Sequence, residues 1–411
     1  MTRFTGPQHG HVVGATRASD TACILETRVR PTLGLPPAPR RRDAFPLLVA
    51  AATLAVVALY FARLGSVPPG PYLDEASIGY NAWTVAHFGV DQYGNHVPLF
   101  FVDFGDYKGP LATYLTVPFA WFFGTTLGAV RAPSVLAGIA TALVAGALAY
   151  RLSRSRGVAL IALLFTALQP WVFLQSHTMM EGNVLLLLGV LLACWFVAEA
   201  TARQHADRWW SAAGVALGAA VFAYSLGRLL TLLLALAVVA TCHRFGRRAM
   251  LRFLFPIGAA YAVLLGATLA NPDVLLARAS VVSVFSDHPT LLAAAGRFLA
   301  NYLSYFNPSF LVISGDGNLR QTTGFGGVIV AATLPLMIAG LVRLVMRLRE
   351  PYSRFIVLGL LVSPIPAALT LVAPHALRGA GMLAFLIVLM IEGLAWAREL
   401  IGSRRALAVT L

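Results

Sequence analysis

A single lysine in an acidic stretch is the first feature of the sequence that could do chemistry. Lys108 is the only lysine among 411 residues, and it stands in FGDYKGPLATYL, two residues after Asp106 and directly before a Gly-Pro pair. An ammonium is a compact point charge that reaches a single phosphate oxygen, whereas the planar guanidinium of arginine is suited to bidentate contacts. The residue type therefore indicates contact with a phosphate. The alternative is a lysine without a function.

Acidic residues that could transfer a proton lie on both sides of this lysine in the sequence. Asp74 and Glu75 follow PPGP, which excludes a helix and is typical of a rigid turn. Adjacent carboxylates at a membrane surface repel each other, so we expect one of them to have a raised pKa suited to proton transfer. The alternative is a solvated acidic loop. Glu181, in QSHTMMEGN, is a third candidate, and in a helix it would share a face with His177.

Three arginines could complete an anion site with Lys108. Arg228, Arg320 and Arg378 each stand at the start of an expected helix or the end of an expected outer loop. Taken singly, each fits an arginine that extends to the membrane interface. Taken together, they indicate an anionic ligand, most simply a phosphate. The further candidate site residues are Asp106, Tyr80, Tyr107 and His177.

The composition requires a membrane to position these residues. The chain is 58% hydrophobic and only 12% charged, more apolar surface than a soluble core can bury. The net charge of +14 comes from short arginine clusters between apolar runs, as in cytoplasmic loops of membrane proteins, so we expect no nucleic-acid partner. The three cysteines show no metal-binding or disulfide spacing, and no metal site is predicted.

The apolar runs predict an all-α polytopic membrane protein of about ten transmembrane helices. The stretch 110–124 is aromatic and too short to span, so we expect an interfacial or re-entrant helix there. With that assignment, 23 of the 31 lysines and arginines fall on one side, which predicts that both termini are cytoplasmic. The expected spans are 44–63, 130–150, 157–176, 182–201, 209–224, 228–243, 249–270, 325–343, 355–372 and 378–397.

The regions between and beyond the spans define the expected domains. Residues 1–43 are predicted to be a disordered cytoplasmic tail, 44–400 a transmembrane domain and 401–411 a second cytoplasmic tail. Two large extracytoplasmic loops, 64–130 and 271–325, would carry the polar chemistry, and the first would include interfacial helices. The first loop holds Asp74, Glu75, Asp91, Asp103, Asp106 and Lys108, and the remaining outer cations are Arg228, Arg278, Arg297, Arg320 and Arg378, with Arg63 and Arg131 near boundaries.

These residues carry a resemblance to a family. The run LDEASIGYNAWTVAHFGVDQYGNHVPLFF, followed by FGDYKGPLATYLTVPFAWFFG, resembles the first outer loop of GT-C glycosyltransferases. The resemblance is to bacterial members of the dolichyl-phosphate-mannose–protein mannosyltransferase and aminoarabinose transferase group. It continues through VRAPSVLAGI, FLQSHTMMEGN, YSLGR, YFNPSFLVISGDGNLRQTTGFG and PHALRGAGML, and it covers roughly residues 64–395.

The resemblance implies transfer of a sugar from a polyprenyl-phosphate carrier to a hydroxyl acceptor outside the cytoplasmic membrane. Asp74 would be the general base, with Glu75 as its alternative, Lys108 would contact the carrier phosphate, and Glu181 would lie near the acceptor or the sugar. A single displacement would invert the anomeric centre. No cofactor is required if Lys108 and the arginines supply the positive charge, although the clustered carboxylates could bind a divalent cation.

Departures from the family pattern leave the sugar and the acceptor open, among them Ala76-Ser77-Ile78, where aminoarabinose transferases have an arginine just after Asp-Glu. Gly109 stands where the family often has proline, Glu181 where it often has aspartate, and His177 near a frequent arginine. Two other classes remain: a transporter or flippase of a lipid-linked phosphosugar, and a non-catalytic partner in cell-envelope assembly. Charged groups that gather at one outer face disfavour the transporter, whose sites lie at mid-membrane. Substitution of Asp74 separates an enzyme from a partner protein.

Overall fold

The computed structural model describes residues 44–203 and 205–410, without the side chains of 403–410. The chain divides into two units, Met1–Ala44 and Phe45–Leu411, and the account below concerns the second unit alone. The predicted N-terminal tail lies outside the described residues. The residues predicted as a C-terminal tail continue the last helix as far as Thr410.

The regular secondary structure of the described part of the chain is helical, apart from one small antiparallel hairpin of two strands. The strands are β1 (Phe101–Asp103) and β2 (Asp106–Lys108). The shorter 3-10 or π turns are η1 (His243–Phe245), η2 (Ser309–Ile313) and η3 (Ala331–Thr333). The α-helices are α1 (Phe45–Phe61), α2 (Leu73–Phe88), α3 (Pro110–Phe123), α4 (Leu127–Ser153), α5 (Arg156–Ala167), α6 (Pro170–Ser176), α7 (Asn183–Thr201), α8 (Asp207–Ala220), α9 (Gly227–Cys242), α10 (Arg247–Ala270), α11 (Asp273–Val282), α12 (Leu291–Ser304), α13 (Leu334–Met346), α14 (Pro351–Val362), α15 (Ile365–Ala368) and α16 (Ala380–Thr410).

The number of helices that can cross a membrane is smaller than the sequence predicted. Within the described residues, six helices or helix runs are long and apolar enough, and the pair α5–α6, bent by 58°, makes a seventh if it is one broken span. Each of the ten expected spans does contain a helix. However, α1 and α13 are apolar but short, and α8 has only 14 residues. An all-α membrane protein is confirmed, with six or seven candidate spans in place of ten.

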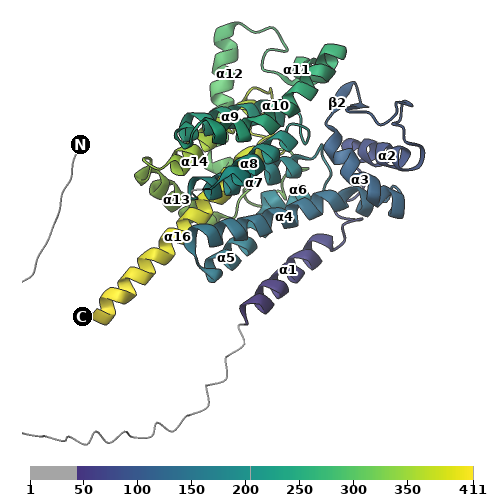
Figure 1. Cartoon of the computed structure of the whole chain (residues 1–411). Helices are drawn as coiled ribbons and strands as arrows, with labels where there is room; N and C mark the ends of the chain where they lie inside the picture. Colours follow the sequence, from purple (N-terminus) through teal and green to yellow (C-terminus); the bar gives the residue numbers. More distant parts are fainter. Residues whose placement is uncertain (1–43, 204, 411) are drawn as a thin grey trace, which may run out of the picture. The chain divides into compact units, whose positions relative to one another are not determined.

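The first outer loop folds into a compact unit at one end of the molecule. Figure 1 shows α2, α3 and the hairpin gathered there, far from the C-terminal end of α16. The predicted short helix over 110–124 is confirmed as α3, whose Pro110 occupies the first helical turn, where a missing amide hydrogen is harmless. Its aromatic end at Trp121, Phe122 and Phe123 is exposed, as expected of an interfacial helix.

Local sequence signals fix where α2 begins and ends. No helix forms over PPGP, as predicted, and α2 starts immediately afterwards, with its N-cap at Tyr72. The Glu75 carboxylate accepts a hydrogen bond from the Tyr72 amide at 3.0 Å, which satisfies a donor left free at the helix start. Gly89 ends the helix in the left-handed conformation, with φ of 69°. The first turn of α2 therefore holds Asp74 and Glu75.

Candidate active site

Lys108 lies at the centre of a buried group of carboxylates. Its Nζ stands 3.2 Å from Asp74 Oδ1, 3.4 Å from Asp106 Oδ2 and 3.0 Å from Glu181 Oε1. We call these four residues the Lys108 centre. They come from the first turn of α2, from β2 and from the segment between α6 and α7. Four residues that the sequence singled out are thus brought together.

Two tight turns direct the side chains to this centre. Phe104 and Gly105, between β1 and β2, have φ of 48° and 76°. Positive φ at both central residues is what a two-residue type I′ hairpin turn requires. Glu181 and Gly182 also have positive φ, 55° and 87°, and the chain turns there immediately before α7. Glycine adopts such φ values without steric cost. Both turns therefore place their acidic residue within reach of Lys108.

Lys108 remains charged in this environment. Only 8% of the residue is exposed. Burial alone lowers the pKa of an ammonium, but the carboxylates of Glu181, Asp74 and Asp106 more than offset it, and the pKa of Lys108 is raised. The lysine is therefore a permanent cation at neutral pH, held by three acidic side chains.

Glu75 serves a different purpose from its neighbour Asp74. Its carboxylate is fully buried and forms a two-pronged ion pair with Arg131 of α4, at 2.7 and 2.9 Å. It also accepts hydrogen bonds from the amides of Tyr72 and Met179. Asp74 keeps 28% of its side chain exposed. The structure therefore separates the adjacent pair: Glu75 joins three segments, and Asp74 faces the accessible side.

Arg131 is satisfied throughout by the turn that precedes α2. Besides Glu75, its guanidinium donates to the carbonyls of Leu64, Pro68 and Gly70 at 2.9–3.0 Å. A buried guanidinium is tolerated only when all of its donors find acceptors. The pair Arg131–Glu75 thus fixes the PPGP turn against α4.

Asp103 is an acidic group that the sequence analysis placed in the loop without assigning it a role. It lies directly across the hairpin from Asp106, and its Oδ2 is buried without a hydrogen-bond partner in the described part of the chain. Like charges at opposed strand positions destabilise a hairpin. Burial raises the pKa of Asp103 to about 6, against the Ser77 hydroxyl and Lys108, which lower it. A shared proton at this position would relieve the repulsion.

The arginines predicted to bind phosphate together with Lys108 lie in different environments. The Arg228 guanidinium is buried, stacks on the Phe100 ring at 5.3 Å and donates to the carbonyls of Val274 and Tyr107. It holds the hairpin against the start of α11. Arg320 stacks on the Tyr72 ring at 5.2 Å. Within the described residues, neither guanidinium forms an ion pair or hydrogen bond with a side chain of the Lys108 centre, so a single ring of cations does not form. The charges of Glu181 and Asp106 nevertheless act on Arg228.

Arg278 of α11 is a cation near the centre that the sequence analysis did not select. Its Nε stands 3.7 Å from Asp106 Oδ2, and its side chain is 48% exposed. The charges of Lys108, Glu181, Arg278 and Arg378 all act on the hydroxyl of the buried Tyr224 side chain. The only signal in the sequence was an outer-loop arginine, which Arg297 shares.

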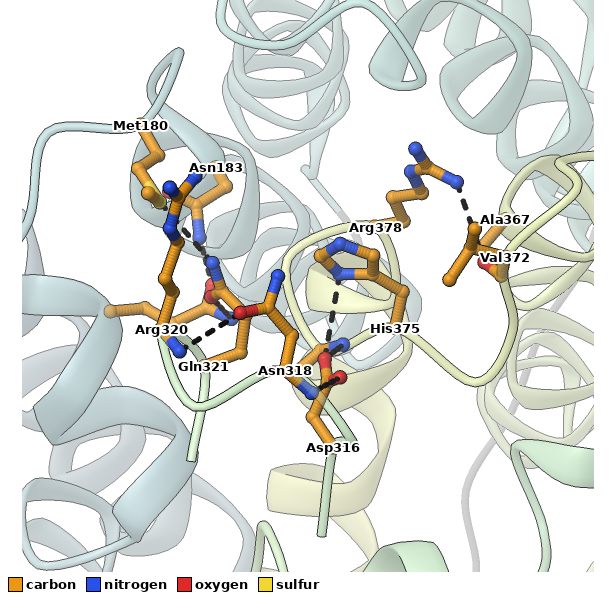
Figure 2. A network of polar contacts seen from close by, with 12 residues as sticks. Met180, Asn183, Asp316, Asn318, Arg320, Gln321, Ala367, Val372, His375 and Arg378 are labelled. Carbon is orange, nitrogen blue, oxygen red and sulfur yellow. Dashed lines mark hydrogen bonds and ion pairs between the residues drawn. The ribbon is translucent and has the colours of Figure 1, made fainter. Parts of the chain in front are cut away.

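Arg378 belongs to a polar network that joins the second outer loop to the segment before α16. Figure 2 shows His375 directed at Asp316, with Arg320 on the left and Arg378 on the right of this view. His375 Nδ1 lies 3.5 Å from Asp316 Oδ2, and Arg378 donates to Thr370 Oγ1 at 2.8 Å. Burial lowers the pKa of His375, against Asp316, which raises it. The network fixes the position of Arg378.

The remaining predicted residues lie around these groups. Tyr80 is half-exposed on α2, and the Tyr107 hydroxyl accepts a hydrogen bond from Asn271 at 2.6 Å. His177 is buried at the end of α6, and its Nδ1 bonds the Phe173 carbonyl at 2.8 Å. It does not contact Glu181, because a turn in place of a helix follows Ser176. Within the described residues, no group of three or more His, Cys, Asp and Glu has the geometry of a metal site.

Comparison with known proteins agrees with this geometry. The family model for dolichyl-phosphate-mannose-protein mannosyltransferase matches residues 107–288, which confirms the resemblance to a glycosyltransferase family that the sequence predicted. The match begins at the hairpin strand that carries Lys108 and includes Glu181. Among curated proteins, no sequence matches the chain.

Solved membrane proteins share the fold. ArnT from Cupriavidus metallidurans bound to undecaprenyl phosphate is 15% identical over 90% of this chain and 64% of its own, with a TM-score of 0.53. Its apo structure gives 16% identity, 89% and 63% coverage and a TM-score of 0.54. The oligosaccharyltransferase AglB from Archaeoglobus fulgidus, in complex with an inhibitory peptide and a dolichol-phosphate, is 13% identical over 90% of this chain and 52% of its own, with a TM-score of 0.50. The chain thus has a GT-C-like fold, and it spans about two thirds or less of these proteins' lengths.

Proposed function

We propose that this chain is a glycosyltransferase that moves a sugar from a polyprenyl-phosphate carrier to a hydroxyl acceptor outside the cytoplasmic membrane. The observation that carries the proposal is the Lys108 centre, a buried cation that holds three carboxylates, of which Asp74 alone is substantially exposed. The carrier is inferred from the structures with the same fold, which hold undecaprenyl phosphate and dolichol-phosphate.

The chemistry follows from the roles that these side chains can take. Asp74 accepts the proton of the acceptor hydroxyl as its oxygen bonds to the anomeric carbon. The bond from that carbon to the phosphate oxygen breaks, and the electron pair leaves with the polyprenyl phosphate. This single displacement inverts the anomeric centre. Glu181, which the Ser225 hydroxyl holds at 3.2 Å, would orient the sugar or the acceptor.

Positive charge must come from more than Lys108. A phosphate that approaches the lysine also approaches the carboxylates around it, and the ammonium alone does not outweigh three negative charges. Arg278, close to Asp106, and Arg378, whose charge also acts on Tyr224, would supply the additional charge. We therefore assign the donor phosphate to Lys108, Arg278 and Arg378, and we assign Arg228 to the support of the hairpin.

The membrane arrangement belongs to the same proposal. Ten spans with both termini in the cytoplasm would place the Lys108 centre, α2 and α3 outside, where the arginine distribution also puts them. The short helices α1, α8 and α13 would then cross a locally thinned bilayer or continue into their flanking turns. Donor lipid would enter between helices beneath the aromatic end of α3.

The test is release of free polyprenyl phosphate by the purified full chain from a panel of polyprenyl-phosphate sugars. Asp74→Asn should reduce the rate by about 10²–10⁴-fold, as expected for loss of a general base, and it should keep the affinity for polyprenyl phosphate. Asp287→Asn is the matched control, because Asp287 is an exposed outer-loop carboxylate paired with Arg297, and its rate should not change.

Two outcomes would refute the proposal. An Asp74→Asn variant with the wild-type rate would remove the assigned base. A wild-type protein that binds polyprenyl phosphate but releases none from any donor would favour transport or a partner role.

A further inference from the structure

A cavity lies near the Lys108 centre without including any of its residues. It has a volume of about 390 Å³, within the size range of small-molecule sites. It lies where the end of α1, the end of α6 and the segment 319–322 meet. Its polar lining comes from Arg63, Tyr72, His177, Thr178, Arg320 and Thr322. We call it the Arg63–Arg320 pocket.

The charged side chains that line this pocket are all positive. Arg63 and Arg320 line it, and no lining residue is acidic. Within the described part of the chain, neither guanidinium forms an ion pair with a carboxylate. Arg320 is stacked on the face of Tyr72, which leaves the N–H groups at the edge of the guanidinium available. Two arginines without counter-ions, facing one cavity, favour an anion in it.

One neutral group of the lining suits the same ligand. The Thr322 hydroxyl accepts a hydrogen bond from the Gly324 amide and keeps its own proton for an anionic oxygen, whereas the Thr178 hydroxyl donates to the Gln175 carbonyl. His177 is held in place, since its Nδ1 bonds the Phe173 carbonyl and its ring packs on the Phe173 ring at a centroid distance of 4.2 Å. A carbonyl only accepts hydrogen bonds, so Nδ1 carries the proton, and Nε2 of the neutral ring offers an anion no donor. The groups of the pocket that can bind an anion are therefore the exposed guanidiniums of Arg63 and Arg320 and the Thr322 hydroxyl.

Two chain segments each contribute to the pocket and to the Lys108 centre. Tyr72 lines the pocket and Asp74 contacts Lys108, and two residues along a chain separate Cα atoms by at most about 8 Å. Thr178 lines the pocket and Glu181 contacts Lys108, at most about 11 Å apart by the same geometry. Glu75 binds the amides of Tyr72 and Met179 and so ties the two segments together.

We propose that the Arg63–Arg320 pocket binds a phosphate group carried by the acceptor, on the far side of Asp74 from the donor phosphate. This inference rests on the proposed function, since it assigns the acceptor side of that site. A phosphate in the pocket would place a hydroxyl of the same molecule, a few bonds away, at Asp74. The acceptor class is thus a phosphorylated glycan or lipid headgroup, and a neutral hydroxyl acceptor would leave both arginines unpaired.

The test uses inorganic phosphate as the probe, with the donor site filled by undecaprenyl phosphate. Calorimetry on the purified full chain should detect phosphate binding in the presence of saturating undecaprenyl phosphate. Arg63→Gln and Arg320→Gln should each weaken that binding by about tenfold or more, as expected for loss of one charge-assisted contact. The affinity for undecaprenyl phosphate should stay within about twofold, since neither arginine contacts the Lys108 centre.

A matched variant and a second measurement keep the result interpretable. Arg297→Gln removes an exposed outer arginine away from the pocket, and phosphate binding should not change. Thermal unfolding should show that all three variants fold, because these side chains lie on exposed residues. Release of polyprenyl phosphate from donor, measured on wild type and on Asp74→Asn, tests the proposed function separately.

Three results would overturn the inference. Phosphate that is displaced by undecaprenyl phosphate, together with weaker lipid binding by the pocket variants, would show that the pocket holds the carrier phosphate. Equal phosphate affinity in wild type and both variants would show that the arginines do not bind it. Absence of phosphate binding by a wild-type protein that turns over donor would show that the pocket takes no phosphate while the proposed function stands.

Discussion

At the scale of single residues, the site depends on a difference between two neighbours. Asp74 and Glu75 are adjacent in the first turn of a helix, and successive helical residues point about 100° apart. One side chain therefore faces Lys108 while the other faces Arg131 of α4. The sequence could identify the acidic pair and the lysine. It could not decide which acid is buried, because that depends on an arginine 56 residues further along the chain.

Glu75→Gln should act on stability. The substitution leaves the Arg131 guanidinium buried without a counter-ion, which costs about 3–5 kcal/mol. The unfolding temperature in detergent should fall well below that of Asp74→Asn, whose side chain is partly exposed and shares Lys108 with two other carboxylates. If Glu75→Gln unfolds at the wild-type temperature and still loses turnover, Glu75 takes part in the reaction directly.

The raised pKa of Asp103 predicts the sign of the pH dependence of folding stability. Its folded-state pKa of about 6 lies above its usual value of 3.8, so the folded protein keeps the proton through this window, and stability falls as the pH rises through it. Asp103→Asn should remove that slope and raise the unfolding temperature at pH 7–8.

Asp287, in the second outer loop, is a control because its pKa is shifted in the opposite direction from that of Asp103. The hydrogen bond from Arg297 lowers the pKa of Asp287, so Asp287→Asn should not raise the unfolding temperature at pH 7–8. A steeper slope between pH 4 and 6 in Asp103→Asn than in wild type would contradict the assignment.

At the scale of elements, the helices were predictable and the hairpin was not. The helix over 110–124 followed from its Gly-Pro start and its length. The strands β1 and β2 have three residues each, and their turn uses Phe104 at positive φ, which is uncommon for a bulky side chain. Such a strand pair has too short a pattern to be read from a sequence. It is nevertheless the hairpin that carries Lys108 into the site.

Gly109→Ala tests the junction between the hairpin and α3. A Cβ at Gly109 would lie 2.3 Å from the Phe222 carbonyl oxygen, so the hairpin and the turn between α8 and α9 would have to move apart. We expect a loss of about 1–3 kcal/mol and a higher KM for donor, because Lys108 is the preceding residue.

Gly128→Ala is the matched control for this junction. No atom lies within 4 Å of a Cβ there, and its φ is not positive, so stability should be unchanged or slightly higher. Equal unfolding temperatures and KM values for the two variants would show that the close contact at Gly109 does not matter.

At the scale of the whole molecule, the sequence predicted the membrane class and the order of the helices, and it overstated the number of long spans. Apolar runs show where helices form. They do not show where a helix bends, and α5 and α6 are separated by a break of 58° that one continuous apolar run does not reveal. The contact of Arg278 with Asp106 could not be predicted from the sequence either, because it joins residues more than 170 positions apart.

The proposed sidedness can be checked with introduced cysteines. In a Cys23→Ser background, Thr323→Cys should react with a membrane-impermeant maleimide on intact cells, and Arg349→Cys should react only after the cells are permeabilised. Both positions are exposed, and Cys194 and Cys242 are buried, so the background should be low. The reverse pattern would place the Lys108 centre in the cytoplasm and refute an extracytoplasmic reaction.

The carboxylate of Glu75 holds the Tyr72 and Met179 amides on the same two oxygens that bind Arg131. The distance between the Arg63–Arg320 pocket and Asp74 is therefore set by a buried ion pair and does not depend on either proposed substrate. A site with this fixed distance would discriminate between acceptors by their length. It would select acceptors by the spacing between their phosphate and their reactive hydroxyl, and lengthening that spacer by a single sugar should abolish transfer even where both groups are retained.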